Sequence, residues 1–238
     1  MGFFRNILPA SLYAFLFEIY QDYIEIKQCC YGYEGEDLIV SKLFLGKKNG
    51  FFVDIGAYHP KTYSNTYLFY KKGWRGINID ANPLSIKKFQ KFRKRDINLN
   101  VGVAKIEGKL CYYMFTEPAL NTFSELVYKD RIEKDKATPI GKVEIPTLPL
   151  KKIFDIYLPK NQKIDFISID TEGFEWEVIE SNDWDEYRPK VILIEEYDRK
   201  KVFVEDSKIY QYFKKLNYAF VAKTFNTFVF LDRDTQLF

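Results

Sequence analysis

The sequence predicts an open α/β sheet of seven mostly parallel strands that finishes in an antiparallel hairpin at its C-terminal edge. Short, almost wholly apolar runs recur along the chain, and helical patterns lie between them. Apolar strands that alternate with helices are typical of a buried parallel sheet. No repeat, low-complexity tract or Pro/Gly-rich linker interrupts the 238 residues. We therefore expect one principal domain.

Five runs rich in Val, Ile, Leu and Phe form the predicted parallel part of the sheet. They lie at residues 51–55, 76–80, 97–101, 165–170 and 190–196. Two later runs form the predicted hairpin around Phe225 and Asn226, at residues 218–222 and 227–231. Helical patterns separate these strands at residues 65–72, 84–94, 174–180 and 207–216. The second helix follows Pro83, a residue favoured at the first helical position.

Residues 105–163 break this rhythm, because one crossover helix needs far fewer residues. The stretch holds a strand-like run at 110–115, a polar run at 121–124 and a helical pattern at 148–158. We interpret it as an inserted cap or lid near the substrate. Asn121, Thr122 and Ser124 are candidates for contacts with substrate hydroxyl groups.

Composition excludes several classes of protein. The chain has 36 Lys and Arg against 33 Asp and Glu, and this excess is too small to indicate a nucleic-acid partner. A single histidine, His59, excludes zinc sites built from several histidines. The three cysteines, Cys29, Cys30 and Cys111, lack CxxC spacing and predict a reducing compartment, hence a cytoplasmic location.

Residues 1–34 are predicted to form an N-terminal amphipathic helical segment. Phe4, Leu8, Leu12, Phe15 and Ile19 follow helical spacing, and the apolar stretch is too short to span a bilayer. Two interpretations remain open. The helix packs on the domain or on a second copy of the chain, or it rests on a membrane surface and makes the protein peripheral to the membrane. The few basic residues favour packing.

Three carboxylates stand at or near predicted strand ends, where open α/β sheets bind their ligands. Asp80 ends the second strand and is placed to accept both hydroxyls of a ribose, as in nicotinamide and adenosyl cofactors. Gly56 stands alone after Asp54, without the GxGxxG pattern that cradles a pyrophosphate. The pattern favours a cofactor without phosphates, ending in an amino acid and a sulfonium. The alternative is that Asp54 and Asp80 only cap helices.

Six motifs carry a family resemblance that runs from residue 32 to residue 196. They are residues 35–38, 50–60, 64–66, 73–76, 79–83 and 167–175. On these motifs the chain resembles the FkbM-type S-adenosylmethionine-dependent methyltransferases, and the long blocks 50–60 and 167–175 are specific when they occur together. The resemblance implies a Rossmann-like class I methyltransferase domain over residues 35–238. It also implies O-methylation, commonly of sugars in glycans or glycosylated metabolites.

The cofactor predicted from the motifs and the resemblance is S-adenosyl-L-methionine. Its candidate ligands follow the first four strands: Asp54, Gly56, Ala57, Ser64, Asn65, Thr66, Asp80, Ala81, Asn100, Val101 and Asp170. Residues 64–66 could instead cap the next helix. Trp176 is predicted to lie in the core, with a sugar-stacking role as the alternative.

A sugar hydroxyl is a weak acid, so its methylation needs a general base or a metal ion. Asp170, Glu172 and His59 are the candidate catalytic residues. In a second hypothesis Asp170, Glu195 and Glu196 hold Mg²⁺. In a third, Glu172 and Glu175 only add negative charge to a helix N-terminus. All three stay open at this stage.

The predicted partner is a carbohydrate acceptor: a glycan, a glycolipid or a sugar nucleotide of polysaccharide biosynthesis. Two other functions compete with the methyltransferase. One is a nicotinamide-dependent oxidoreductase on a similar sheet, and the other is a non-catalytic binding module. The missing GxGxxG counts against the first, and the intact strand-end acids count against the second.

Overall fold

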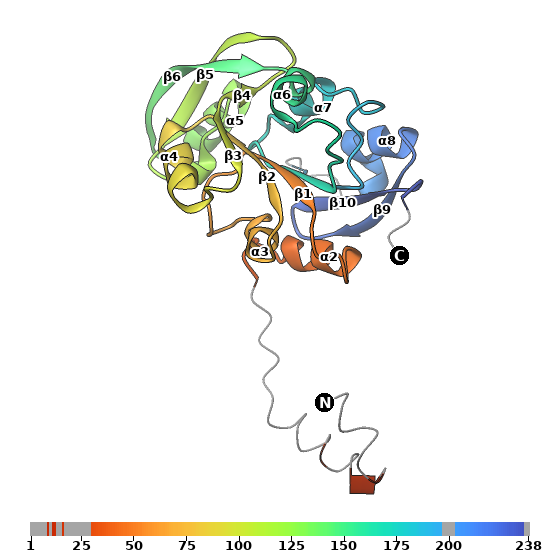
Figure 1. The fold of residues 1–238 in the computed structure, drawn as a ribbon. Helices are drawn as coiled ribbons and strands as arrows, with labels where there is room; N and C mark the ends of the chain where they lie inside the picture. Colours follow the sequence, from red (N-terminus) through yellow and green to blue (C-terminus); the bar gives the residue numbers. More distant parts are fainter. Residues whose placement is uncertain (1–8, 10, 13–15, 17–29, 197–202, 236–238) are drawn as a thin grey trace.

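The computed structural model describes residues 9, 11–12, 16, 30–196 and 203–235. Its main sheet has seven strands in the order β3-β2-β1-β7-β8-β10-β9 (Figure 1). In chain order they are β1 (Phe51–Ile55), β2 (Arg75–Asp80), β3 (Ile97–Asn100), β7 (Phe166–Ile169), β8 (Val191–Glu195), β9 (Tyr218–Lys223) and β10 (Thr227–Asp232). The first five are parallel, and β10 runs antiparallel between β8 and β9. This arrangement confirms the predicted fold class.

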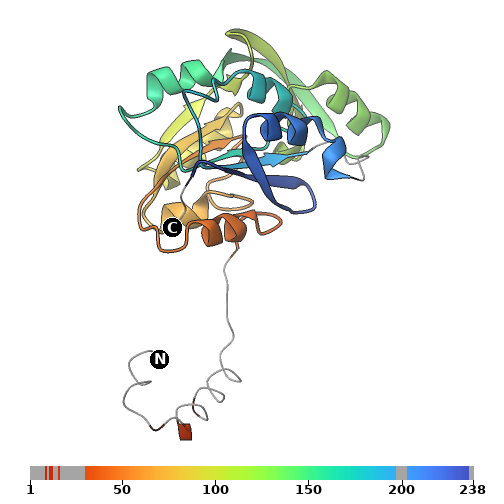
Figure 2. The same cartoon turned by 90° about the vertical axis from the view of Figure 1, so that its right-hand side faces the viewer.

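Helices cover both faces of the sheet, so the apolar strands are buried on both sides (Figures 1 and 2). Successive β1 residues point to opposite faces, and Val53 and Phe52 therefore belong to different core clusters. The Val53 cluster includes side chains from α6 (Leu150–Tyr157), α7 (Glu175–Glu180) and α8 (Lys208–Lys215). The Phe52 cluster includes side chains from α2 (Glu36–Leu43) and α3 (Tyr67–Lys71). A 3₁₀ turn, η3 (Val204–Asp206), precedes α8.

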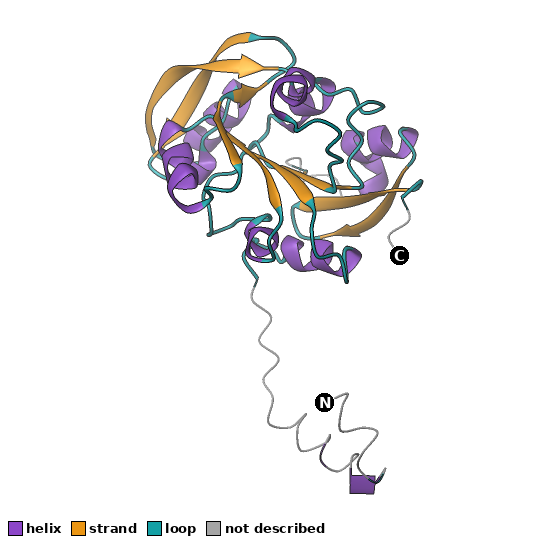
Figure 3. Ribbon diagram, in the orientation of Figure 1, coloured by secondary structure: helices purple, strands orange, loops and turns teal. Residues whose placement is uncertain are grey.

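The insertion folds into a second sheet that projects beside the main one (Figure 3). Its strands are β4 (Gly102–Val103), β5 (Gly108–Phe115) and β6 (Pro139–Leu148), in the order β4-β6-β5. Between β5 and β6 lie η2 (Pro118–Leu120) and α5 (Glu125–Glu133). The predicted strand at 110–115 and helix at 148–158 are present. β6 and α5 were not predicted.

Most of the N-terminal segment 1–34 lies outside the described residues, so its predicted helix, with its packing or membrane contact, stays a prediction. Of the helices in the described part of the chain, none has the length and apolar character needed to cross a bilayer. The end of the segment joins the domain. The Tyr31 carbonyl accepts a hydrogen bond from the Ser64 amide (2.9 Å), and Glu34 Oε1 accepts one from Asn226 Nδ2 (2.7 Å).

A fully buried arginine links α4 (Pro83–Phe92) to the loop after β1. Arg93 Nε donates to Asp96 Oδ2 (2.9 Å), Nη1 to the Pro60 carbonyl (3.0 Å) and Nη2 to Thr66 Oγ1 (2.8 Å). Its guanidinium also lies over the Tyr70 ring, 4.5 Å from the centroid. The loop that carries residues 60–66 is therefore fixed by one side chain from the next crossover.

Replacing Arg93 with Met should cost about 3–5 kcal/mol of stability, because the buried Asp96 carboxylate then loses its charged partner. Urea unfolding followed by circular dichroism measures this loss. Arg95→Met is the matched control: Arg95 is an exposed neighbour that also stacks on Tyr70, and its loss should cost less than about 1 kcal/mol. Equal effects of the two substitutions would contradict this role for Arg93.

Candidate active site

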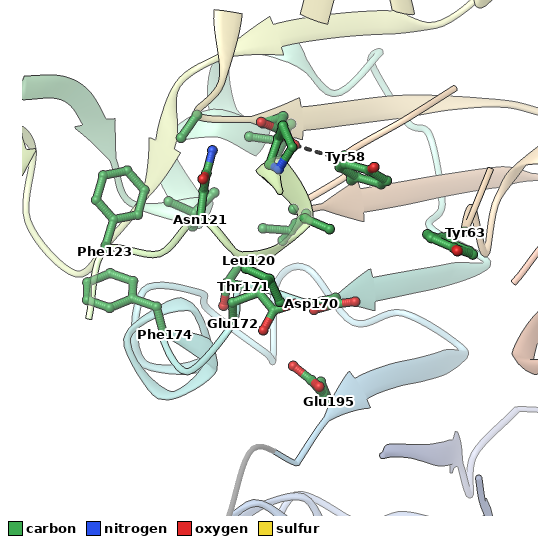
Figure 4. A pocket seen from close by; sticks show the side chains of 18 of the residues that line it. Tyr58, Tyr63, Leu120, Asn121, Phe123, Asp170, Thr171, Glu172, Phe174 and Glu195 are labelled. Carbon is green, nitrogen blue, oxygen red and sulfur yellow. Dashed lines mark hydrogen bonds between the residues drawn. The ribbon is translucent and has the colours of Figure 1, made fainter. Parts of the chain in front are cut away.

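A cavity of about 360 Å³ opens beyond the carboxyl ends of β1, β2, β7 and β8. The main sheet contributes Gly56, Asp80, Asp170 and Glu195 to its lining, each at or just after a strand end. The insertion adds residues from β4, β5, η2 and α5. Figure 4 shows Asp170 and Glu195 between two aromatic groups, with Phe123 and Phe174 on one side and Tyr58 and Tyr63 on the other.

The turn after β1 needs glycine at residue 56. Gly56 has φ = 77°, and a Cβ atom there would lie 1.6 Å from the Asp170 carbonyl oxygen. Its amide donates to the Ile79 carbonyl (3.0 Å), so the turn is held between β2 and β7. The bare backbone at Gly56 lets a ligand approach the strand end closely.

Asp80 lies on the cavity wall with both carboxylate oxygens held in place. Oδ2 accepts from the Tyr58 amide (2.7 Å) and Oδ1 from the Asn82 amide (2.7 Å). Each oxygen keeps a second lone pair for a ligand donor. Burial raises the pKa of Asp80 to about 6, so the carboxylate is ionised at neutral pH. The Asn100 side chain supports this turn by donating to the Asp80 and Ala81 carbonyls, each at 2.9 Å.

The loop 64–66 divides into one cavity residue and two buried supports. Asn65 lines the cavity; its Nδ2 donates to Ser168 Oγ (3.1 Å), and its buried Oδ1 finds no hydrogen-bond partner among the described residues. Thr66 Oγ1 donates to Asp54 Oδ2 (2.7 Å), and the Ser64 hydroxyl lies 3.3 Å from Thr66 Oγ1. Asp54 therefore holds the loop from below the cavity and does not belong to its lining.

Asp170, Glu175 and Glu195 bring carboxylate oxygens within 4.8 Å of one another. Asp170 is open to the cavity, and Glu195 Oε2 is buried without a hydrogen-bond partner among the described residues. Desolvation within the cavity, followed by the neighbouring carboxylates, raises the pKa of both Asp170 and Glu195 well above the ordinary range. The pair therefore holds a proton that isolated carboxylates would lose at neutral pH.

The remaining acids after β7 and β8 have other contacts. Glu172 lines the cavity and pairs with Arg131 of α5. Glu175 accepts from the Thr171 amide (2.8 Å) and the Gly173 amide (3.1 Å), so it fixes the loop before α7. The Ser207 hydroxyl donates to Glu196, which does not join Asp170 and Glu195. Glu175 takes the place predicted for Glu196 in the carboxylate cluster.

His59 stabilises a turn and does not belong to the cavity lining. Its Nδ1 accepts from the Lys61 amide (3.3 Å) and the Thr62 amide (3.0 Å). Burial, followed by the nearby Lys88 and Lys61 charges, lowers its pKa. A ring nitrogen used as an acceptor in this way is typical of a neutral structural histidine.

The other predicted site residues separate into lining and supporting groups. Ala81, Val101 and Asn121 line the cavity, whereas Ala57, Thr122 and Ser124 do not. Ser124 caps α5, and Thr122 Oγ1 donates to the Glu172 carbonyl (2.9 Å). Trp176 also lies outside the lining; its ring meets Tyr212 edge to face and carries Lys208 Nζ at 3.3 Å.

Sequence reasoning did not select several residues that line the cavity. The apolar end contains Phe123 and Phe174, whose ring centroids are 5.5 Å apart. The opposite part contains side chains from far along the sequence: Tyr33, Glu34, Glu36, Tyr58, Tyr63, Asn226 and Thr227. Glu36 belongs to the block 35–38 and Tyr58 to the block 50–60, both of which carried the family resemblance, and these blocks were the available signals for this part of the cavity.

The strand order, the antiparallel β10 and the acid that ends β2 define the class of Rossmann-like methyltransferases. Residues 54–220 match the family described as the Methyltransferase FkbM domain. Because the match covers more than half of the chain, the protein belongs to the FkbM methyltransferase family. No curated protein matches the chain.

Family membership implies that S-adenosylmethionine is the methyl donor, and the cavity residues fit this molecule. Asp80 offers two charged acceptors to a ribose, and Phe123 and Phe174 provide an apolar end for an adenine ring. Asn65 Oδ1 is a buried acceptor that lacks a donor among the described residues, and an α-ammonium group supplies one.

Proposed function

We propose that the protein is an S-adenosylmethionine-dependent O-methyltransferase that acts on a sugar hydroxyl of a glycan or glycoconjugate. The observation that carries the proposal is the Asp170–Glu195 carboxyl pair, which lies in the cavity between the Phe123–Phe174 pair and Tyr58 and Tyr63. A cytoplasmic location and a carbohydrate acceptor belong to this proposal. So does a contact of the N-terminal segment with a membrane surface or with a second copy of the chain.

Some cavity residues hold the cofactor, and others orient the acceptor and transfer its proton. Asp80 and Asn65 hold the two polar ends of the cofactor, and Gly56 permits its close approach. When bound, S-adenosylmethionine supplies a methyl group on a positively charged sulfur. Asp170 and Glu195 orient the acceptor hydroxyl. The pair holds one proton, and the carboxylate that stays ionised accepts the hydroxyl proton, since its raised pKa suits a base better than that of an ordinary carboxylate.

The same carboxylates also have the oxygen donors that Mg²⁺ prefers, so a metal is the second hypothesis for this step. We favour the carboxyl pair as the base because Glu175 is already held by Thr171 and Gly173. With the acceptor supplied as a host glycan extract, EDTA should leave methyl transfer unchanged. Loss of transfer that Mg²⁺ restores would assign the step to a metal.

The acceptor is identified by mass spectrometry of host glycans with and without the gene. We expect a loss of about 14 Da, one CH₂ unit, at each modified site in the deletion strain, and its return with the wild-type chain. If the Asp170→Asn chain also restored the lost mass in the deletion strain, that result would contradict the proposal. Unchanged glycans in the deletion strain would also contradict the carbohydrate acceptor.

A further inference from the structure

Tyr33, Tyr58 and Tyr63 line the cavity and form a wall of contacting rings. Figure 4 shows Tyr58 and Tyr63 on the side away from the Phe123–Phe174 pair. Tyr33 is 71% exposed and Tyr63 is 50% exposed, although both line the cavity. Their rings meet edge to face with centroids 5.0 Å apart, and Tyr58 stacks on Tyr63 at 6.3 Å. Open aromatic faces in a cavity are typical of a surface that a ligand covers.

The wall is held in position from both ends. Glu34, next to Tyr33, accepts hydrogen bonds from the Asn226 amide (2.9 Å) and side chain (2.7 Å). The Tyr31 carbonyl and the Ser64 amide join the two segments that carry Tyr33 and Tyr63. The tyrosine faces are therefore preorganised, and a ligand does not have to order them.

The charge around this wall is negative. Glu34 and Glu36 line the cavity together with the Asp170–Glu195 pair, which holds one proton, and repulsion from Glu36 contributes to the raised pKa of Asp170. Among the described lining residues Arg131 is the only basic one, and it pairs with Glu172. Glu195 is buried, with only 9% of its surface exposed, and its Oε2 lacks a donor among the described residues.

Aromatic faces next to carboxylates recognise a cation, because each ring face is negative and each carboxylate accepts its N–H groups. A neutral ring would cover the tyrosines but would leave the buried Glu195 Oε2 without a donor, and an anion would be repelled. We propose that the Tyr33–Tyr63 wall and the adjoining carboxylates bind a protonated amine on the acceptor, so that the acceptor is an amino sugar. This inference rests on the proposed function and names its substrate class.

The reaction stays at oxygen under this proposal. A protonated amine has no free electron pair, so it is bound and not methylated. The amine positions the ring, and a neighbouring hydroxyl faces the Asp170–Glu195 pair. Acceptors with a carboxylate or phosphate on the same ring are excluded by the charge of the cavity.

The test uses the full chain with bound S-adenosylhomocysteine and three sugars that differ in one substituent. Saturation-transfer NMR compares methyl β-D-glucosaminide, methyl β-D-glucoside and methyl β-D-glucuronide at a pH where the amine is protonated. We expect the glucosaminide to bind about tenfold more tightly than the glucoside, and the glucuronide to give no transfer. Equal or tighter binding of the glucoside or glucuronide, or no binding of the glucosaminide, would overturn the proposal.

Variants locate the effect at the tyrosine wall. Tyr33→Ala and Tyr63→Ala should each weaken glucosaminide binding about 5- to 30-fold while the affinity for S-adenosylhomocysteine stays unchanged. Tyr157→Ala, at a part-exposed tyrosine of α6 outside the cavity, is the control and should change neither. Unchanged glucosaminide binding in both wall variants overturns the assignment. Loss of S-adenosylhomocysteine binding by the wild type would instead refute the proposed function.

Discussion

Asp80→Ala should weaken binding of S-adenosylhomocysteine about 100-fold. The substitution removes both charged acceptors that Asp80 presents to a ribose, and hydrogen bonds to a charged group contribute about 1.5 kcal/mol each. It also leaves the Tyr58 and Asn82 amides without their partner, which loosens the turn after β2. Isothermal titration calorimetry measures the change.

Asp165→Ala is the matched control for this experiment. Asp165 is equally buried but precedes β7, so it lies at the opposite edge of the sheet, where it accepts from Lys47 (2.7 Å), Lys190 (3.1 Å) and the Phe51 amide (3.1 Å). Its loss should reduce the free energy of unfolding and leave the affinity unchanged. If Asp165→Ala weakened binding as much as Asp80→Ala, the effect would be one of folding and not of recognition.

Asp170→Asn should lower the rate of methyl transfer about 100- to 10,000-fold, the usual contribution of a general base. Affinity for S-adenosylhomocysteine should stay near the wild-type value, since the substitution keeps the size of the side chain. S-adenosylhomocysteine release with a host glycan extract measures the rate. A variant that keeps the wild-type rate would contradict the role of Asp170.

The pH dependence of the same pair has a definite sign. A carboxyl with a raised pKa is protonated at low pH, so methyl transfer should increase as the pH rises through the apparent pKa of the pair. Glu172→Gln should move that midpoint to lower pH, because Glu172 contributes the largest like-charge repulsion that raises the pKa of Asp170. Stability should show the opposite trend. The folded wild type binds more protons than the unfolded chain, so it loses stability as the pH rises from the ordinary carboxyl pKa to the raised one.

The main sheet was predictable because its strands are buried on both faces and therefore appear as continuous apolar runs. β1 occupies the predicted residues 51–55, and the other strand boundaries differ by one residue at most at either end. The insertion was harder to predict. β6 contains Pro139, Gly141 and Pro146 and is exposed over most of its length. Its sequence therefore shows neither a continuous apolar run nor a regular alternation of apolar and polar residues. In α5 only Val127 and Arg131 are buried, and no apolar stripe marks the helix.

The site was predictable where it depends on strand ends. Gly56, Asp80 and Asp170 meet because parallel strands bring their carboxyl ends to one edge. The tyrosine wall depends instead on tertiary contacts, such as those of Glu34 with Asn226, between segments far apart in the chain. His59 was singled out by its place beside the glycine turn, and in the structure its ring nitrogen accepts from the Lys61 and Thr62 amides and holds the turn that follows it.

We propose that this cavity binds S-adenosylmethionine and not a nicotinamide cofactor. Calorimetric titration of the wild-type chain with S-adenosylhomocysteine tests it most directly, with an NADH fluorescence titration of the same sample beside it. We expect saturable binding of S-adenosylhomocysteine at one site per chain and no saturable NADH signal. Saturable NADH binding without any heat from S-adenosylhomocysteine would contradict it.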